Sequence, residues 1–233
     1  MPQTQSLPLY VQISEMLNRD IQAGRLLDGE RLPPEREMAA QLGISVGTLR
    51  KALADLTAKG LLQRTQGSGN YVRKGASADS VYAFFRLEMI CGGGLPTAEV
   101  LSVATLTKPD DLPDFGRSDR AHRIRRLRRL NGVPAALEEI WLDASYVPEL
   151  RAGDLSDALY LFYRTRLGLW IARAEDRIGV GRLPDWGAGH LPVLDTSCLG
   201  RVDRVSFDQN NEKAEISQTW FDSEHVRYVS MLK

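Results

Sequence analysis

Residues 44–60 read ISVGTLRKALADLTAKG, and this stretch decides the fold of the N-terminal part of the chain. Its leucines recur at the spacing of one helix face and are Leu49, Leu53 and Leu56. Ser45 is a residue type that caps helix N-termini, and Gly60 ends the pattern. The stretch therefore predicts a helix with one buried face and with polar residues exposed near its start.

Two further helices are predicted before this one. Leucine and isoleucine recur every fourth residue from Leu9 to Ile21, and Gly24 ends that helix. Pro33-Pro34 favours the start of a short second helix over residues 35–42. Only a few residues, including Gly43, separate it from the third helix, which is the spacing of a helix-turn-helix.

After Gly60 the periodicity changes to two. Residues 61–65 and 70–73 flank the sequence QGSG at 66–69, which predicts a β-hairpin with a glycine-rich tip. Helices followed by such a hairpin predict a winged helix-turn-helix that reads DNA with its third helix and its wing. The alternative is a small helical domain whose charges are merely solvated.

Composition indicates a two-domain protein. The 233 residues carry 30 basic and 30 acidic side chains, but residues 1–75 hold ten basic against seven acidic ones. A small, polar stretch follows, so we predict a DNA-binding domain at 1–75, a linker at 76–80 and a second domain at 81–233. With two cysteines, no secretory pattern at the start and no long apolar run, we expect a cytoplasmic protein without a membrane span.

The second domain alternates strand-like runs with one clear helix. Residues 97–107, 202–207 and 228–232 are rich in β-branched and aromatic residues. Residues 157–167 have helical spacing, and Gly168 ends them. This pattern predicts an α+β domain with an antiparallel sheet.

Arginines crowd one of these strands. Arg126 and Arg128 are two residues apart and therefore project to one face, where two guanidinium groups suit a phosphate, sulfonate or carboxylate. Glu138 and Glu215 either compensate this charge or accept hydrogen bonds from ligand hydroxyls, and a structural ion pair is the alternative role. Arg123, Arg125 and Arg129 lie on the opposite face, where we expect them to be mostly solvated.

No catalytic or metal-binding pattern accompanies these arginines. The three histidines and two cysteines lack metal-ligand spacing, so we expect no metal and no cofactor. A Ser-His-Asp triad has no nucleophile-elbow motif to support it, and we expect no enzymatic activity.

The N-terminal residues 7–73 resemble the GntR family of bacterial repressors. The resemblance is carried by PLYVQI at 8–13, GERLPPERE at 29–37, ISVGTLRKAL at 44–53 and QGSGNYV at 66–72. It implies DNA contacts from the start of the second helix, from the third helix and from the wing, namely Arg36, Ser45, Gly47, Thr48, Arg50, Gln66 and Gly67. Val46 stands where the family commonly has arginine, so we expect a different base preference there, because arginine pairs with guanine and valine contacts a thymine methyl.

The C-terminal half resembles the effector domain, known as UTRA, of the HutC branch of this family, whose fold is similar to chorismate lyase. The matching residues are Met89, Gly93 and Pro96, the arginines from Arg126, Asn131 to Pro134 with Glu138, and Asp203 to Asp208 leading through Glu215 and Ser217 to Trp220-Phe221. The implied effector contacts are Arg86, Arg126, Arg128, Glu138, Glu215 and Phe221. Arg86 stands where the family has a short polar residue, which predicts an unusually cationic pocket.

The sequence thus predicts a homodimeric transcriptional regulator, a repressor that a small anionic effector releases from a palindromic operator in double-stranded DNA. Two alternatives stay open. The C-terminal domain retains lyase-like activity, or the protein is a constitutive DNA binder with a vestigial pocket.

Overall fold

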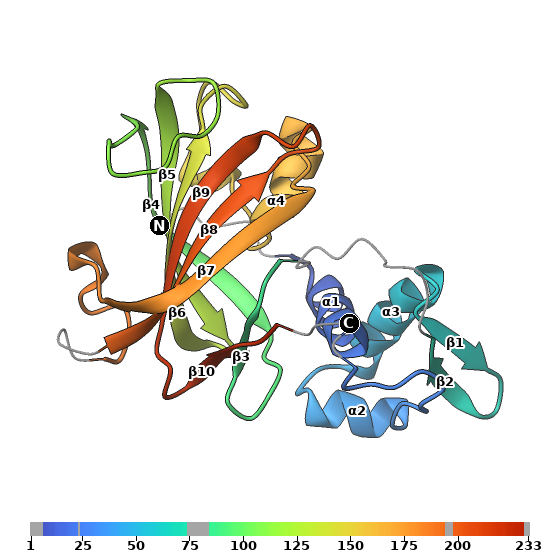
Figure 1. Ribbon diagram of the computed structural model, residues 1–233. Coiled ribbons are helices and arrows are strands. Elements are labelled where there is room, and N and C mark those ends of the chain that lie inside the picture. Colours follow the sequence, from blue (N-terminus) through green and yellow to red (C-terminus); the bar gives the residue numbers. More distant parts are fainter. Residues whose placement is uncertain (1–6, 23, 74–83, 194–197, 231–233) are drawn as a thin grey trace. The chain divides into compact units, whose positions relative to one another are not determined.

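Three helices and a β-hairpin build the N-terminal unit (Figure 1). They are α1 (Leu9–Gln22), α2 (Glu35–Gln41), α3 (Val46–Ala58), β1 (Leu62–Thr65) and β2 (Gly69–Val72). The computed structural model describes residues 7–22, 24–73, 84–193 and 198–230, which fall into two units, 7–85 and 86–229. The predicted winged helix-turn-helix is confirmed, whereas the predicted linker at 76–80 lies outside the described residues.

The third helix forms for the reasons that its sequence predicts. The Ser45 hydroxyl accepts a hydrogen bond from the Thr48 backbone N–H at 3.1 Å, which caps the helix. Leu49, Leu53 and Leu56 are buried, and α3 contacts α1 and the first strand of the wing, β1. At the other end of α3, Lys59 donates to the fully buried Glu15 of α1 at 2.8 Å, so an ion pair closes the α1–α3 contact.

The wing has a third, short extended segment that the sequence does not predict. Residues 29–32 pair with β2 through hydrogen bonds from Gly29 to Val72, from Val72 to Glu30 and from Leu32 to Asn70. The turn at residues 28–29 is therefore the start of a strand-like segment. It places Arg31 beside the tip of the wing.

The C-terminal unit is built on a six-stranded antiparallel sheet in the order β4-β5-β6-β9-β8-β7 (Figure 1). Its strands are β4 (Pro96–Thr107), β5 (Arg120–Leu130), β6 (Val133–Asp143), β7 (Arg173–Arg182), β8 (Cys198–Phe207) and β9 (Lys213–Phe221). Two short strands, β3 (Leu87–Met89) and β10 (Val226–Tyr228), pair separately. The predicted α+β architecture with an antiparallel sheet is confirmed. The sequence predicts a last strand over residues 228–232, but the observed last strand, β10, ends at Tyr228. Its partner β3 is short and limits the length of the pairing.

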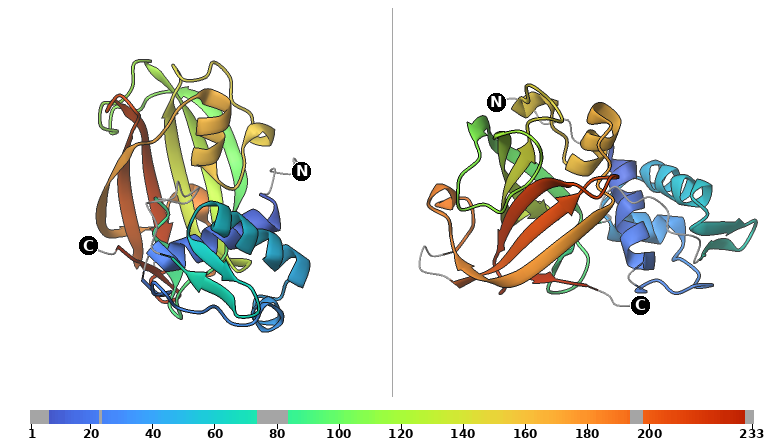
Figure 2. Two further views of the ribbon diagram at one scale, coloured as in Figure 1. Left: turned by 90° about the vertical axis from the view of Figure 1, so that its right-hand side faces the viewer. Right: turned by 45° about the horizontal axis from the view of Figure 1, so that its top comes forward.

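One short helical segment covers one face of the sheet (Figure 2). It begins as α4 (Leu159–Phe162) and continues as a π-helical turn, η2 (Tyr163–Leu167), until Gly168 ends it with a φ of 65°. Two 3₁₀ turns, η1 (Ala152–Asp154) and η3 (Asp185–Gly187), complete the unit. On the other face, Trp186 of η3 packs edge-on against Trp220, in a cluster with Leu127, Leu137, Leu191 and Leu199.

Asp143, at the end of β6, anchors the loop before β5. Its buried carboxylate accepts from Lys108 at 2.6 Å and from the Ser118 backbone N–H at 3.1 Å. Burial would raise the pKa of this carboxyl, but the hydrogen bonds, first among them that of Lys108, outweigh burial and hold the pKa below its usual value. A Cβ at Gly116 would lie 2.1 Å from the Asp143 carboxyl carbon, so only glycine fits opposite it.

A carboxyl with a lowered folded-state pKa stabilises the protein above its unfolded pKa, about 3.9, and this contribution is lost as the pH falls through the lower folded pKa. We therefore expect Asp143→Asn to lower the free energy of unfolding at pH 7 by about 1–3 kcal/mol. The difference should shrink as the pH falls below about 4. Urea unfolding between pH 3 and pH 7 measures it, with the exposed Asp111→Asn as control. A difference that does not change with pH would contradict the assigned role.

Candidate functional site

The first turn of α3 presents the predicted DNA contacts. Ser45, Gly47 and Arg50 are exposed and Thr48 is half-buried, with its hydroxyl 2.8 Å from that of Ser45. The Arg50 side chain is 64% exposed and forms an ion pair with Glu35 of α2 at 2.6 Å. Glu35 thus holds the Arg50 guanidinium group at the surface of the helix-turn-helix.

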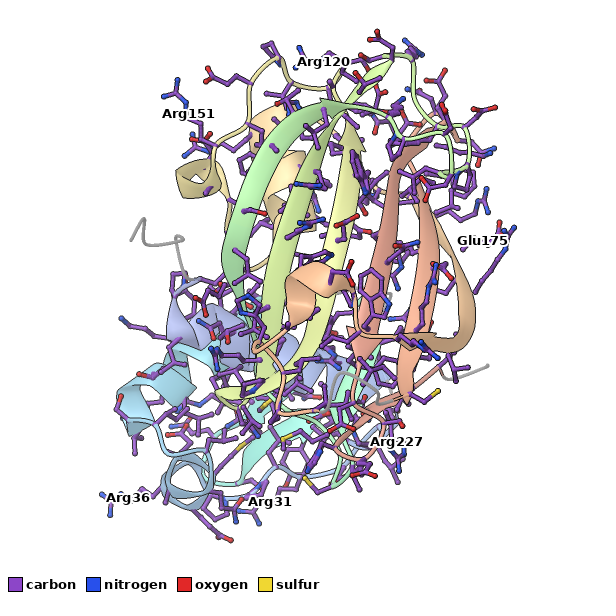
Figure 3. All side chains as sticks on the ribbon, turned by 90° about the vertical axis from the view of Figure 1, so that its left-hand side faces the viewer. Arg31, Arg36, Arg120, Arg151, Glu175 and Arg227 are labelled. Carbon is purple, nitrogen blue, oxygen red and sulfur yellow. The ribbon has the colours of Figure 1, made fainter. Side chains whose placement is uncertain are left out.

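The other predicted contacts also lie at the surface of the N-terminal unit. Arg36 projects from α2 into solvent (Figure 3). Gln66 and Gly67 are exposed at the tip of the wing, where Gly67 has a φ of 75°. This backbone conformation favours glycine and lets the main chain approach a groove closely.

The sequence prediction missed one exposed arginine at the wing. Arg31 lies at the surface (Figure 3), and its backbone pairs with Tyr71 of β2. Its guanidinium Nε would lie 3.2 Å from a Cβ at Gly69, so the absent side chain leaves room for the arginine on the wing. The basic excess of residues 1–75 is the signal that could have drawn attention to it.

In the C-terminal unit, the strand register brings the predicted effector residues onto one face. Arg126 of β5 lies opposite Glu138 of β6 and, beyond it, Thr219 of β9. Arg128 lies two residues further along β5, on the same face. Its cross-strand neighbour is Ala136 of β6 and, beyond it, Phe221 of β9. This is the face that α4 and η2 cover.

Arg126 and Arg128 both bind Glu138. The Arg126 Nη2 lies 2.7 Å and the Arg128 Nε 2.9 Å from the same Glu138 oxygen, and all three residues are buried. Arg128 also donates from Nη1 to the Asp157 carbonyl at 3.0 Å. One oxygen of the Glu138 carboxylate therefore faces both guanidinium groups.

Arg126 is the incompletely satisfied member of this cluster. It is 2% exposed, and its Nε and Nη1 have no hydrogen-bond partner in the part of the chain that the structure describes. Burial and then the charge of Arg128 lower the pKa of Arg126. Burial would raise the pKa of Glu138, but the two arginines outweigh it and hold that pKa below its usual value.

Glu215 has a different environment. It is 1% exposed and accepts hydrogen bonds from the hydroxyls of Tyr163 at 2.7 Å, Tyr160 at 3.0 Å and Ser206 at 3.1 Å. Burial raises the pKa of this carboxyl despite these bonds. Of the two predicted glutamates, Glu138 thus pairs with the arginines, while Glu215 ties the α4–η2 segment to the sheet.

The remaining predicted effector residues lie further along the same face. The charge of Arg86 helps to lower the pKa of Asp176, whose main partner is Arg204 of β8 in a two-bond ion pair of 2.6 and 2.7 Å. Arg86 therefore belongs to the Asp176 cluster. Phe221 is buried with its ring against Gly200, where a Cβ would come within 2.3 Å of it.

The arginines on the opposite face are less solvated than predicted. Arg123, Arg125 and Arg129 are all half-buried. Arg125 lies 4.8 Å from the ring of Trp186 and binds Glu139 at 2.6 Å, and Arg123 lies over Trp141. Aromatic rings on this face thus lie against the guanidinium groups of Arg123 and Arg125, a packing that a charge run in the sequence does not reveal.

The described residues contain no cluster of three or more histidine, cysteine or acidic side chains that could hold a metal ion. Among the same residues, no helix is long and apolar enough to cross a membrane.

Comparisons with known proteins match both units. The model of bacterial regulatory proteins of the gntR family matches residues 9–72, and that of the UTRA domain matches residues 92–227. The HTH-type transcriptional regulator SmoD of Agrobacterium fabrum is 60% identical over 228 residues, which cover 98% of this chain and 97% of that protein.

Two proteins of lower sequence identity also match most of this chain. The mannosyl-D-glycerate transport/metabolism system repressor MngR of Escherichia coli is 29% identical over 204 residues, 85% of this chain and 80% of that protein. The crystal structure of PhnF from Mycobacterium smegmatis shares the fold, with a TM-score of 0.52 and 22% identity over 94% of this chain and 98% of that one.

Proposed function

This chain belongs to the GntR family of bacterial regulatory proteins, in the HutC-type group that carries a UTRA domain, and we propose that it is a homodimeric repressor which a small organic anion releases from a pseudo-palindromic operator. It is a DNA-binding transcriptional regulator with an effector domain. We further propose that the protein is cytoplasmic, and that the residues named above as DNA and effector contacts bind these ligands.

The buried, incompletely bonded Arg126 is the observation that carries the effector chemistry. A buried guanidinium whose N–H groups lack acceptors is costly, and an anionic oxygen that accepts from Nε and Nη1 removes that cost. An anionic acceptor suits these free guanidinium donors better than a neutral one, because a hydrogen bond between two charged groups is the stronger. The name of one relative refers to mannosyl-D-glycerate, which carries a carboxylate, and this agrees with an organic anion.

Effector binding releases DNA only if the effector prefers an arrangement of the two DNA-binding heads that no longer matches the operator half-sites. Coupling of about 1–3 kcal/mol between the two sites is typical of such regulators. The lyase alternative rests on the likeness of fold alone, whereas the DNA-binding head and the regulatory relatives favour binding without turnover.

The outer edge strand β7 supports the dimer. It pairs only with β8 among the described strands, and its side chains Ile178 and Val180 are 59% and 74% exposed. A long exposed edge strand with apolar side chains readily pairs with another chain. A two-fold dimer through this edge provides the two heads that a pseudo-palindromic operator requires.

Operator binding tests the DNA-binding part of the proposal. We expect the protein to prefer its own upstream DNA over a scrambled duplex in fluorescence anisotropy, at low and at roughly physiological salt. Arg50→Ala should weaken operator binding at least about ten-fold, the loss of one charge-assisted contact. Arg25→Ala, in the same unit but paired with Asp20, serves as control. Equal binding of Arg50→Ala and the parent protein would remove Arg50 from the interface.

Thermal unfolding with a panel of organic phosphates, sulfonates and carboxylates tests the effector site. We expect at least one anion to raise the Tm of the parent protein and to release the operator, and Arg126→Met to abolish both effects. Arg120→Met, an exposed arginine on the same strand (Figure 3), should keep both. If the anion still raises the Tm of Arg126→Met and still releases the operator, Arg126 does not bind the effector. A pocket that binds no anion would instead support the vestigial alternative.

Sedimentation velocity tests the dimer interface. We expect Val180→Lys to raise the dimer dissociation constant at least about ten-fold, because it places a charge in an apolar strand contact. Val133→Lys changes an exposed apolar residue away from β7 and should leave the dimer unchanged. If the Val180→Lys variant has the same dimer dissociation constant as the parent protein, the dimer interface does not include this part of β7.

A further inference from the structure

Asp157 is a buried carboxylate next to the arginine cluster, and the effector residues predicted from the sequence do not include it. It lies between η1 and α4 and is 3% exposed. Its Oδ1 accepts from the backbone N–H of Ala98 on β4 at 3.3 Å, and its backbone carbonyl accepts from Arg128 at 3.0 Å. The second carboxylate oxygen, Oδ2, is buried and has no hydrogen-bond partner among the residues described.

This unpartnered acceptor complements the unpartnered donors of Arg126. The two residues are linked through Arg128 and Glu138, since Arg128 binds the Asp157 carbonyl and Glu138 binds both arginines. Buried polar groups are nearly always hydrogen-bonded, so two orphaned groups of opposite polarity in one connected cluster need an explanation. They do not satisfy each other, although a carboxylate and a guanidinium group attract strongly. A bound molecule that accepts at one end and donates at the other satisfies both.

The protein holds Asp157 firmly in this position. Its neighbours Leu155, Ala158 and Leu159 are buried, and the Ser156 hydroxyl donates to the Ala158 carbonyl at 2.9 Å. The cross-strand neighbours of Arg128 on both sides, Ala98 and Ala136, are small. The carboxylate is thus preorganised beside the arginine cluster, which suits a binding residue.

We propose that Asp157 binds the effector through Oδ2, and that the effector is an organic anion which also carries a hydroxyl or ammonium group. The anionic oxygens accept from Arg126, and the hydroxyl or ammonium group donates to Asp157. A simple inorganic anion, or an organic anion without a donor, satisfies Arg126 alone. This inference rests on the anion site of the proposed function and adds a second requirement to it.

Matched pairs of anions test the donor requirement in the full-length protein. Glycerol 3-phosphate and 2-aminoethylphosphonate carry a hydroxyl or an ammonium donor, and propyl phosphate and ethylphosphonate are the corresponding anions without one. Glycerate and propionate form a carboxylate pair. We expect each donor-bearing anion that binds to do so at least about ten-fold more tightly than its counterpart, by thermal shift and calorimetry. Whether the glycerol or the amino compound gains more identifies the donor as hydroxyl or ammonium.

Asp157→Asn tests the residue. Asparagine has the same shape, keeps an oxygen for the Ala98 N–H and places an NH₂ donor where Oδ2 was. We expect the variant to lose at least about ten-fold in affinity for the donor-bearing anions and to bind propyl phosphate and propionate as the parent protein does. Asp154→Asn, an exposed carboxylate on η1 that accepts from Arg151, should change neither.

Three outcomes would overturn the inference. Equal binding of the two members of each pair by the parent protein removes the donor requirement while leaving the anion site intact. An equal loss of both members in Asp157→Asn assigns the residue a structural role only. If no anion of any pair binds, the anion site fails as well, and the proposed effector chemistry falls with it.

Discussion

The contact between Arg126, Arg128 and Glu138 is the interaction on which the C-terminal unit depends. Three charged groups are buried in the middle of a six-stranded sheet, where ions are stable only with partners. The strand register supplies one carboxylate for two guanidinium groups, and the carbonyl of Asp157 satisfies a further donor of Arg128. Arg126 is left with donors that the described residues do not satisfy. These unsatisfied donors are the reason why we propose an anionic effector at Arg126.

The same face of the sheet carries two further groups of polar contacts. Glu215 holds the α4–η2 segment through Tyr160 and Tyr163, and burial raises its pKa. The Arg204–Asp176 pair, with Tyr228 donating to Asp176, joins β8 and β7 to β10, the strand that pairs with β3 at the start of this unit. The polar contacts of this face thus reach β3, the first strand of the C-terminal unit. Coupling between an effector site and the DNA-binding unit needs a physical connection, and we propose these contacts as candidates for it.

Local patterns in the sequence predict the N-terminal unit almost completely. The leucine spacing and the Ser45 cap define α3, and the glycines of the QGSG turn define the wing, because helix caps and hairpin turns depend on neighbouring residues. The paired segment at residues 29–32 escaped prediction because its partner lies some 40 residues later. In the C-terminal unit, the two-residue spacing predicts that Arg126 and Arg128 share a face. The choice of Glu138 over Glu215 as their partner, and the place of Asp157, depend on strand order and on a loop that no local pattern encodes.

We propose that the free N–H groups of Arg126 donate to an anionic effector. The nuclear magnetic resonance signal of its Nε–H group tests this most directly. Arg126→Lys lacks that group and so assigns the signal in the ¹⁵N-labelled protein. The account predicts that the anion which most raises the Tm shifts this signal along a saturating curve, with the same Kd as the thermal shift. An anion that stabilises the protein while the Arg126 signal stays unchanged would contradict the account.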